Sequence, residues 1–268
     1  MKKIYVVTGG SGGIGLDAAK AFKGNAVMIL DVNEAALATG KQELEKLGIE
    51  AYAEKCDVTN KENVQAVAEK AAKIGQIAGI IHTAGVSGTV TNPDLVLKVD
   101  LVGTENIIEG FYPYLQKGSA MVLIASMMAY TIPANSAYDE LLKNPYTPNF
   151  YEGMKSFHRG DSNLAYNFAK RGVQLLAEKW APKYGEKGAR ITSISPGIIE
   201  TPMALKASEE HPEQMAYMKS LTPMKRNGNP ADITAAIVFL CGAGASFISG
   251  TDLRVDGGLI KTLLAQKH

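Results

Sequence analysis

The sequence predicts an α/β fold in which one parallel sheet of about seven strands carries helices on both faces. Short apolar runs alternate with amphipathic stretches along the whole chain of 268 residues. The runs are apolar at nearly every position, which is typical of strands buried on both faces. This length allows one large domain or two small ones. The unbroken alternation favours a single doubly wound domain over residues 1–268.

The N-terminal half supplies four expected strands with helices between them. The strands are expected at Lys3–Val7, Ala26–Leu30, Glu50–Glu54 and Ile77–His82. The helices are expected at Ile14–Phe22, at Glu34–Leu47 and from Asn60 to Ile74. In the second helix Leu37, Leu44 and Leu47 fall on one face, and Gly48 is a typical stop residue. Asn60 is a residue type that caps helix N-termini well.

The C-terminal half continues the alternation but contains two irregular segments. Further strands are expected at Ala120–Ala125, Ala189–Ile194 and Thr251–Val255, and helices at Asp100–Leu115, Asn163–Lys183 and Pro230–Leu240. Residues 129–162 form an insertion rich in Pro, Asn and Tyr, and residues 198–224 form an expected substrate loop rich in Met and Glu. Both segments follow strands, and ligands of open α/β sheets bind outside the carboxyl ends of the strands.

Composition excludes several classes of protein. With 28 basic and 27 acidic residues the net charge is +1, so we expect no nucleic-acid or anionic-membrane partner. Two cysteines, Cys56 and Cys241, cannot build a disulfide framework or a multi-cysteine metal site, and no metal is expected. The N-terminal apolar run Ile4–Val7 is too short for a signal peptide. A cytoplasmic protein is therefore expected.

A glycine-rich turn follows the first strand. Five glycines fall within the seven residues Gly9–Gly15, directly before the first helix. Glycines let the backbone approach a pyrophosphate closely, and the helix N-terminus favours its negative charge. The turn therefore predicts a dinucleotide site, although a tight turn without a ligand would need similar residues.

Two carboxylates at strand ends bear on which dinucleotide binds. Asp31 ends the second strand, where a carboxylate accepts hydrogen bonds from an adenosine ribose and repels a 2′-phosphate. No Arg or Lys lies in Asp31–Glu34, so NAD is favoured over NADP. Asp31 is also placed to cap the next helix. Asp57, at the end of the third strand, is expected either to bind the adenine amino group or to act as a turn residue.

Tyr166 and Lys170 are the candidate reaction centre. They are four residues apart on an expected helix and therefore share one face. A tyrosine hydroxyl ionises near about pH 10, and a nearby cation favours the phenolate, so the pair is suited to exchanging a proton with an alcohol or ketone oxygen. Tyr151 and Lys155 have the same spacing. They lie in the irregular insertion, where no long helix is expected, so Tyr166 is preferred.

Taken together, these motifs resemble the short-chain dehydrogenase/reductase family over essentially the whole chain. The matching landmarks are Thr8-Gly9…Gly13-Ile14-Gly15, Ser126 after the fifth strand, Tyr166 with Lys170, Pro196-Gly197, Thr201, and Asp256-Gly257-Gly258. The resemblance implies a Rossmann fold and an NAD-dependent oxidoreductase that interconverts secondary alcohols and ketones.

The resemblance also implies residue roles. Ser126 would hydrogen-bond the substrate oxygen, Tyr166 would be the acid/base, and Lys170 would favour the phenolate and bind the nicotinamide ribose. Ile199 and Thr201 would hold the carboxamide. The implied cofactor-binding residues are Gly9, Ser11, Gly13, Ile14, Gly15, Asp31, Asp57, Val58, Ala84, Gly85, Tyr166, Lys170, Pro196, Ile199 and Thr201.

The chain departs from the family pattern at two buried positions. His82-Thr83 stands where the family has two asparagines before Ala84-Gly85. His82 is interpreted as a satisfied buried histidine rather than a proton shuttle. Asp100 occupies the position of the family's fourth catalytic residue, an asparagine whose backbone helps to hold a relay water. Asp100 is counted among the catalytic residues here, and whether its carboxylate perturbs Lys170 is left open.

A third departure concerns the substrate side. The interval from Ser126 to Tyr166 is 40 residues, so roughly 27 residues are inserted relative to most family members. The insertion resembles that of some bacterial hydroxysteroid dehydrogenases/carbonyl reductases. It is expected to act either as a substrate lid or as a cover over the helix pair that commonly forms the oligomer interface. A homo-oligomer, dimer or tetramer, is implied.

Methionines suggest the substrate class. Five of them fall on segments expected around the site: Met127, Met128, Met203, Met215 and Met218. Because methionine builds adaptable apolar walls, the favoured substrate is a bulky apolar alcohol or ketone such as a hydroxysteroid or bile acid. The alternatives are a broad-specificity carbonyl reductase/alcohol dehydrogenase on smaller cyclic substrates, a non-catalytic NAD-binding regulator, and an isomerase that uses bound NAD.

Overall fold

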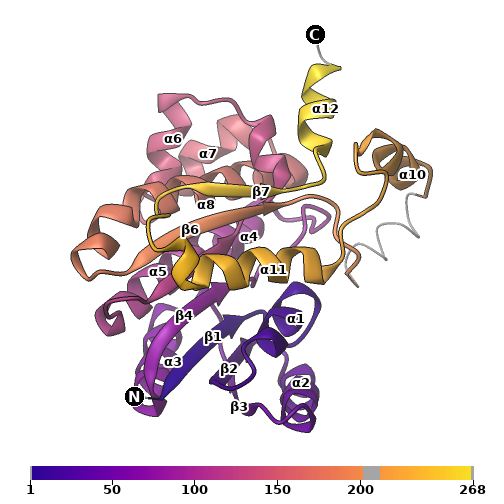
Figure 1. Ribbon diagram of the computed structural model, residues 1–268. Helices are drawn as coiled ribbons and strands as arrows, with labels where there is room; N and C mark the ends of the chain where they lie inside the picture. Colours follow the sequence, from indigo (N-terminus) through magenta and orange to yellow (C-terminus); the bar gives the residue numbers. More distant parts are fainter. Residues whose placement is uncertain (1, 202–211, 267–268) are drawn as a thin grey trace.

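A computed structural model describes residues 2–201 and 212–266, and in this part of the chain seven strands form one parallel sheet (Figure 1). The strands are β1 (Lys3–Thr8), β2 (Ala26–Asp31), β3 (Glu50–Lys55), β4 (Gln76–His82), β5 (Ala120–Ile124), β6 (Arg190–Pro196) and β7 (Asp252–Val255). Their order is β3-β2-β1-β4-β5-β6-β7. The expected fold, a single doubly wound domain, is confirmed.

Helices cover both faces of the sheet (Figure 1). One face carries α1 (Gly13–Ala21), α2 (Glu34–Lys46) and α11 (Pro230–Cys241), and the other carries α3 (Lys61–Ile74), α5 (Gly103–Phe111) and α8 (Ser162–Glu186). Side chains alternate across each strand: Val27 and Ile29 of β2 join one core cluster, while Met28 and Leu30 join the other. The inner strands β2, β4 and β5 are accordingly apolar at most positions, whereas the edge strand β3 carries Glu50, Glu54 and Lys55.

The sheet changes direction of winding at β1. This strand pairs with β2 on one side and β4 on the other, so the chain crosses back over it after β3. A crevice forms outside the carboxyl ends of the strands at such a switch point. Thr8 and His82 are register partners at the ends of β1 and β4, so the loops that follow these strands leave side by side.

The helix expected over Asp100–Leu115 begins earlier, which corrects the sequence prediction. It starts as α4 (Pro93–Leu97), with Asn92 as the N-cap, and passes through a π-helical turn, η1 (Lys98–Val102), before α5. It ends in a short 3-10 turn, η2 (Tyr112–Tyr114). Asn92 and the proline after it are sufficient start signals, but the apolar run behind them is short. Asp100 consequently lies in the middle of a helix rather than at its start.

The insertion is mostly helical and packs against α4 and α8. A 3-10 turn, η3 (Met127–Thr131), leads into α6 (Ser136–Lys143) and α7 (Phe150–His158), which lie against α4 and α8. Tyr138 and Phe150 are buried in the same core cluster as the sheet. Asp139 of α6 receives two hydrogen bonds from Arg171 of α8. The expectation of an irregular segment is therefore wrong for most of its length.

Two helices near the C-terminus do not appear in the sequence prediction. They are α10 (Pro212–Leu221), within the expected substrate loop, and α12 (Leu259–Ala265), and they pack together at the upper right of Figure 1. Leu259 and Ile260 of α12 pack with Met127 in a third, smaller cluster of buried apolar side chains. This cluster lies on the side of the molecule where β6 and β7 end.

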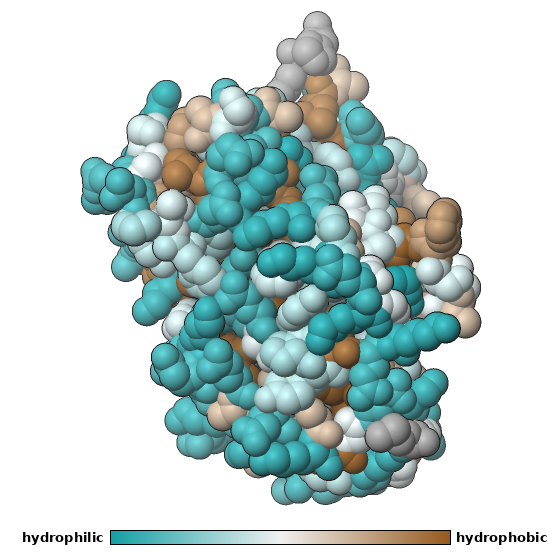
Figure 2. Space-filling model, turned by 90° about the vertical axis from the view of Figure 1, so that its left-hand side faces the viewer, coloured by the Kyte–Doolittle hydropathy of each residue, from teal (hydrophilic) through white to brown (hydrophobic). Residues whose placement is uncertain are grey.

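One face of the molecule is mostly polar. Figure 2 shows a face covered mainly by hydrophilic side chains, with only small apolar areas. Within residues 2–201 and 212–266, every helix is too short or too polar to span a bilayer.

Candidate active site

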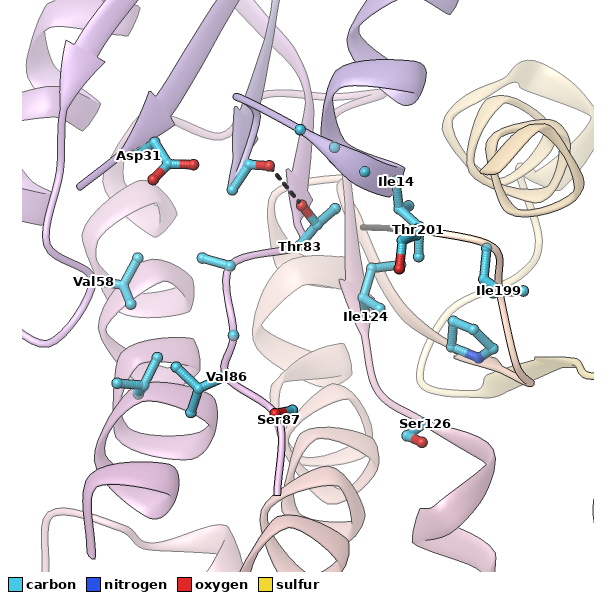
Figure 3. Close-up of a pocket in the computed structure, with 18 of the residues that line it drawn as sticks. Ile14, Asp31, Val58, Thr83, Val86, Ser87, Ile124, Ser126, Ile199 and Thr201 are labelled. Atoms are coloured by element: carbon cyan, nitrogen blue, oxygen red, sulfur yellow. Dashed lines mark hydrogen bonds between the residues drawn. The ribbon is translucent and has the colours of Figure 1, made fainter. Parts of the chain in front are cut away.

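One cavity of about 730 Å³ follows the carboxyl ends of the strands, from β2 to the segment after β6 (Figure 3). In Figure 3, Asp31 and Val58 lie at one side of the cavity, and Ser126 and Ile199 lie at the other. Every predicted site residue except Asp100 lines it. Those residues are Gly9, Ser11, Gly13, Ile14, Gly15, Asp31, Asp57, Val58, Ala84, Gly85, Ser126, Tyr166, Lys170, Pro196, Ile199 and Thr201. Asp100 lies directly behind this wall, against Lys170.

The glycine loop is packed too tightly to carry side chains. A Cβ on Gly15 would lie 2.2 Å from the carbonyl oxygen of Gly9. Gly9 itself has a φ of +61°, and its Cβ would lie 2.8 Å from the amide nitrogen of Ala84. The N-cap of α1 is Gly12, which makes no side-chain capping hydrogen bond. The first amides of α1 therefore face the cavity without an internal acceptor, an arrangement that fits the pyrophosphate of a dinucleotide.

Asp31 is held at the edge of the cavity by two hydrogen bonds. The Ser11 hydroxyl donates to its Oδ2, and the Asn33 amide donates to its Oδ1 at 3.2 Å. Asn33, not Asp31, caps α2 by accepting from the Ala36 amide at 3.1 Å. The capping alternative for Asp31 is therefore wrong, and Asp31 lines the cavity. Among the described residues that line the cavity, Lys170 is the only Lys or Arg.

Asp57 both stabilises the turn after β3 and lines the cavity. Its carboxylate accepts from the Thr59 amide at 2.8 Å, and its own amide donates to the Asn63 side chain at 2.8 Å. Asn60 caps α3 as expected. Val58, the next residue after Asp57, is buried and supplies an apolar surface beside it.

The proposed reaction centre is built from β5 and α8. Asp161 caps α8, which places Tyr166 in its second turn and Lys170 one turn later. The Lys170 Nζ lies 5.4 Å from the centre of the Tyr166 ring and donates to the Ile124 carbonyl of β5 at 3.2 Å. Ser126 follows β5, and its Oγ accepts from the Met128 amide at 3.2 Å. Ser126, Tyr166 and Lys170 all line the same end of the cavity.

Lys170 is paired with the buried carboxylate of Asp100. Its Nζ lies 3.2 Å from Asp100 Oδ2, while Asp100 Oδ1 accepts from the Val86 amide at 2.7 Å. Burial alone would lower the pKa of Lys170, but the charges of Asp100 and Tyr166 and the hydrogen bond to Asp100 raise it above its usual value. Burial raises the pKa of Asp100, opposed by the Lys170 ammonium and the Val86 amide. Lys170 is accordingly an ammonium at neutral pH.

His82 is a satisfied neutral imidazole, as the sequence suggests. The Ala84 amide donates to the Thr8 hydroxyl at 3.2 Å, and that hydroxyl lies 2.7 Å from His82 Nδ1. His82 Nε2 lies 3.0 Å from the Thr104 hydroxyl, which donates to the Asp100 carbonyl at 2.6 Å. One consistent direction of donation, from Ala84 to Asp100, satisfies every group. Burial, aided by the Lys170 charge, lowers the pKa of His82 to about 3.

Some lining residues are absent from the sequence prediction. Thr83 donates to the Thr8 carbonyl at 2.7 Å and ties the loop after β4 to the end of β1. The others are Gly12, Leu30, Val32, Cys56, Val86, Ser87, Val99, Ile124, Ala125, Gly197 and Ile198. Most of these are apolar neighbours of predicted residues, and the only signal for them in the sequence is their place at strand ends.

The methionine wall is only partly present among the described residues. Met215 of α10 lines the cavity. Met127 is buried in the third apolar cluster, with Met128 and Met218 partly buried against it. Met203 lies outside the described residues. Methionines therefore support the wall of the substrate end as well as contributing to its surface.

Comparisons with known proteins agree on one family. Residues 3–139 match the model of the short chain dehydrogenase family, and residues 152–260 match a model described as enoyl-(acyl carrier protein) reductase. The chain is 29% identical to 7alpha-hydroxysteroid dehydrogenase of Escherichia coli, covering 97% of this chain and 95% of that one. It is 27% identical to glucose 1-dehydrogenase 2 of Bacillus subtilis, covering 96% and 94%. A solved structure of a short-chain type dehydrogenase/reductase from Mycobacterium ulcerans superposes with a TM-score of 0.79 at 26% identity, over 97% of this chain and 90% of that one.

Proposed function

The chain belongs to the short-chain dehydrogenase/reductase family, an oxidoreductase family acting on CH–OH groups, and from this premise we propose that it is an NAD-dependent dehydrogenase of a secondary alcohol. The observation that carries the proposal is the meeting of two sites in one cavity. A glycine cradle for a dinucleotide and the three residues Ser126, Tyr166 and Lys170 line the same cavity. A dinucleotide held in the cradle would extend toward these three residues.

The proposed chemistry divides between the cofactor and the chain. A bound nicotinamide supplies hydride acceptance and donation at the carbinol carbon. The Ser126 hydroxyl hydrogen-bonds the substrate oxygen, and Tyr166 takes up the proton of that oxygen as the phenolate or returns it as the hydroxyl. The Lys170 ammonium favours the phenolate of Tyr166 electrostatically. Ile199 and Thr201 line the wall where the carboxamide would lie.

NAD rather than NADP is the proposed cofactor. The Asp31 carboxylate is fixed by Ser11 at the edge of the cavity, where it would accept hydrogen bonds from a ribose diol and would repel a 2′-phosphate. No cation lines that end among the described residues, since Lys170 lies at the opposite end. A 2′-phosphate would thus meet an anion without any compensating charge.

The substrate end favours a bulky apolar alcohol or ketone such as a hydroxysteroid or bile acid. Its described lining includes Val86, Ile198 and Met215 and no basic side chain other than Lys170. The apolar cluster of η3, α10 and α12 backs this surface. A smaller cyclic substrate is the second candidate, because the relative named glucose 1-dehydrogenase 2 matches over nearly the same length as the hydroxysteroid dehydrogenase.

The test is a screen of the purified chain with NAD against hydroxysteroids, bile acids and simple cyclic alcohols. The proposal expects reduced nicotinamide to accumulate with at least one secondary alcohol, and faster with the bulky apolar ones. Turnover confined to small sugars or cyclic alcohols would favour the second candidate. Tight NAD binding without turnover of any alcohol or ketone would instead favour a non-catalytic regulator and overturn the proposal.

We also propose that the chain forms a homo-oligomer through the outer face of α11 and β7. Val238 and Phe239 of α11 and Leu253 of β7 are large exposed apolar side chains, and Phe247, between the two elements, is fully exposed. β7 is an edge strand with one unpaired side. Exposed apolar side chains beside an unpaired strand favour association with a second copy. The cytoplasmic location stays a prediction from the sequence.

Replacing Phe247 with Asp should lower the molar mass measured by light scattering after size-exclusion chromatography. A charge placed in a buried apolar interface costs far more than one left on the surface. Leu47→Asp, an exposed apolar position on α2's C-terminal end, is the matched control and should keep the wild-type mass. An unchanged mass for Phe247→Asp would place any interface elsewhere.

A further inference from the structure

Asp100 lies in an unusual piece of helix. It is the central residue of η1, the π-helical turn between α4 and α5, and it is almost wholly buried. π-helical turns are rare and are found frequently at functional sites. The residue is fixed at two further atoms, because its carbonyl accepts from Thr104 at 2.6 Å and its Oδ1 accepts from Val86 at 2.7 Å. Its carboxylate can therefore move little.

The second carboxylate oxygen has one partner. Apart from Lys170, no polar group of the described residues pairs with Asp100 Oδ2. Asp100 lies behind Gly85 and Lys170, which both line the cavity. A Cβ on Gly85 would come within 3.3 Å of both Asp100 Oδ1 and Lys170 Nζ. Lys170 thus reaches the cavity directly, and Asp100 is separated from it by no more than Lys170 and the backbone of Gly85.

Few other charges act on Lys170. From its own helix it faces Tyr166, and from η1 it faces Asp100. From β4 it faces His82, which is neutral, and from β5 it faces only the Ile124 carbonyl. Asp100 is therefore the one anion opposite this ammonium among the described residues. A buried carboxylate and ammonium held this close nearly cancel each other's charge at a distance.

We propose that Asp100 is a positioning residue that acts through Lys170, holding its ammonium between η1 and the Ile124 carbonyl of β5 and partly neutralising its field on Tyr166, so that catalysis is shifted to higher pH. The proposal rests on the proposed function of Tyr166 as acid/base. It has two separate consequences. The carboxylate keeps the buried ammonium protonated to high pH, and it weakens the attraction of that ammonium for the Tyr166 phenolate.

Asp100→Asn tests both consequences, since an amide has the same shape and its oxygen can still accept from Val86. Without the carboxylate, burial acts unopposed on Lys170, so the pKa of Lys170 falls. The alkaline limb of the plot of kcat/KM against pH therefore moves to lower pH. The unneutralised ammonium favours the phenolate more strongly, so the acid limb also moves to lower pH. We expect a shift of both limbs by about one pH unit or more.

Glu105→Gln is the matched control. Glu105 is a second buried carboxylate a little further along the same helix, 2.8 Å from the Lys179 Nζ, and it does not line the cavity. Neutralising it should leave the position of both limbs unchanged. If Asp100→Asn does not fold by circular dichroism, Asp100→Ser carries the same test, since a smaller neutral side chain fits the same space.

Failure of this proposal and failure of the proposed function give different results. Limbs that stay in place in Asp100→Asn, with only a lower maximum, would show a merely structural role and overturn the proposal. If no alcohol is turned over, the proposed function fails, and the proposal is judged without substrate. The readout is then the tyrosinate absorbance that Tyr166→Phe removes. In Asp100→Asn that absorbance should appear at lower pH than in wild type, and an unchanged titration would overturn the proposal.

Discussion

Replacing Tyr166 with Phe should lower kcat by about 100- to 10,000-fold, the range that a positioned acid/base contributes. The substitution removes one hydroxyl oxygen and keeps the ring beside the Lys170 ammonium. NAD affinity, measured by calorimetry or fluorescence titration, should change little, because the substitution leaves the glycine cradle and Asp31, which we propose to hold the rest of the dinucleotide, unchanged.

Tyr151→Phe is the matched control for that variant. Tyr151 has the same spacing to a lysine, but it lies on α7 of the insertion, stacked edge-on against Phe150, and does not line the cavity. Its loss should leave kcat near the wild-type value. Undiminished turnover in Tyr166→Phe, or a large loss in Tyr151→Phe, would contradict the assignment of the acid/base.

Replacing Asp31 with Ala should change the ratio of kcat/KM for NAD to kcat/KM for NADP by about 100-fold in favour of NADP. Hydrogen bonds to a charged group contribute roughly 1.5 to 3 kcal/mol, so their loss alone weakens NAD by about 10- to 100-fold. Removal of the anion also relieves repulsion of a 2′-phosphate. Initial rates with each cofactor measure the ratio.

Asp57→Ala separates a ribose-specific effect from a general loss of charge. Asp57 lines the same end of the cavity from the end of β3 but is engaged in the turn to Thr59. Its loss should weaken NAD and NADP alike and leave the ratio unchanged. An unchanged ratio in Asp31→Ala would mean that Asp31 only orders the loop through Ser11 and Asn33.

The parts of the fold and site that could be predicted are those where local chemistry leaves few alternatives. Only glycine fits where Gly15 approaches the Gly9 carbonyl, so the run of glycines predicts the cradle. Strands covered on both faces are mostly apolar, so the apolar runs predicted the strands of the sheet as well. The four-residue spacing of Tyr166 and Lys170 brings their side chains together only on a helix, and the amphipathic pattern of this segment predicted that helix, α8.

The parts that could not be predicted depend on contacts between distant segments. The sequence leaves open whether the Asp100 carboxylate acts on Lys170, because 70 residues separate them and only the fold places the two groups 3.2 Å apart. The satisfied state of His82 likewise requires Thr8 from β1 and Thr104 from α5. The insertion looked irregular because its helices are short, and their stability comes from burial against α4 and α8 rather than from local signals.

The most direct test of the central claim uses an alcohol found by the screen, deuterated at its carbinol carbon. After oxidation by the purified chain, mass spectrometry of the reduced cofactor should show one deuterium in the nicotinamide ring, with NMR placing it at C4 and on one face. The same incubation with Tyr166→Phe should yield little labelled cofactor. Reduced cofactor without deuterium would contradict direct hydride transfer between the alcohol and the nicotinamide, and with it the account of this site.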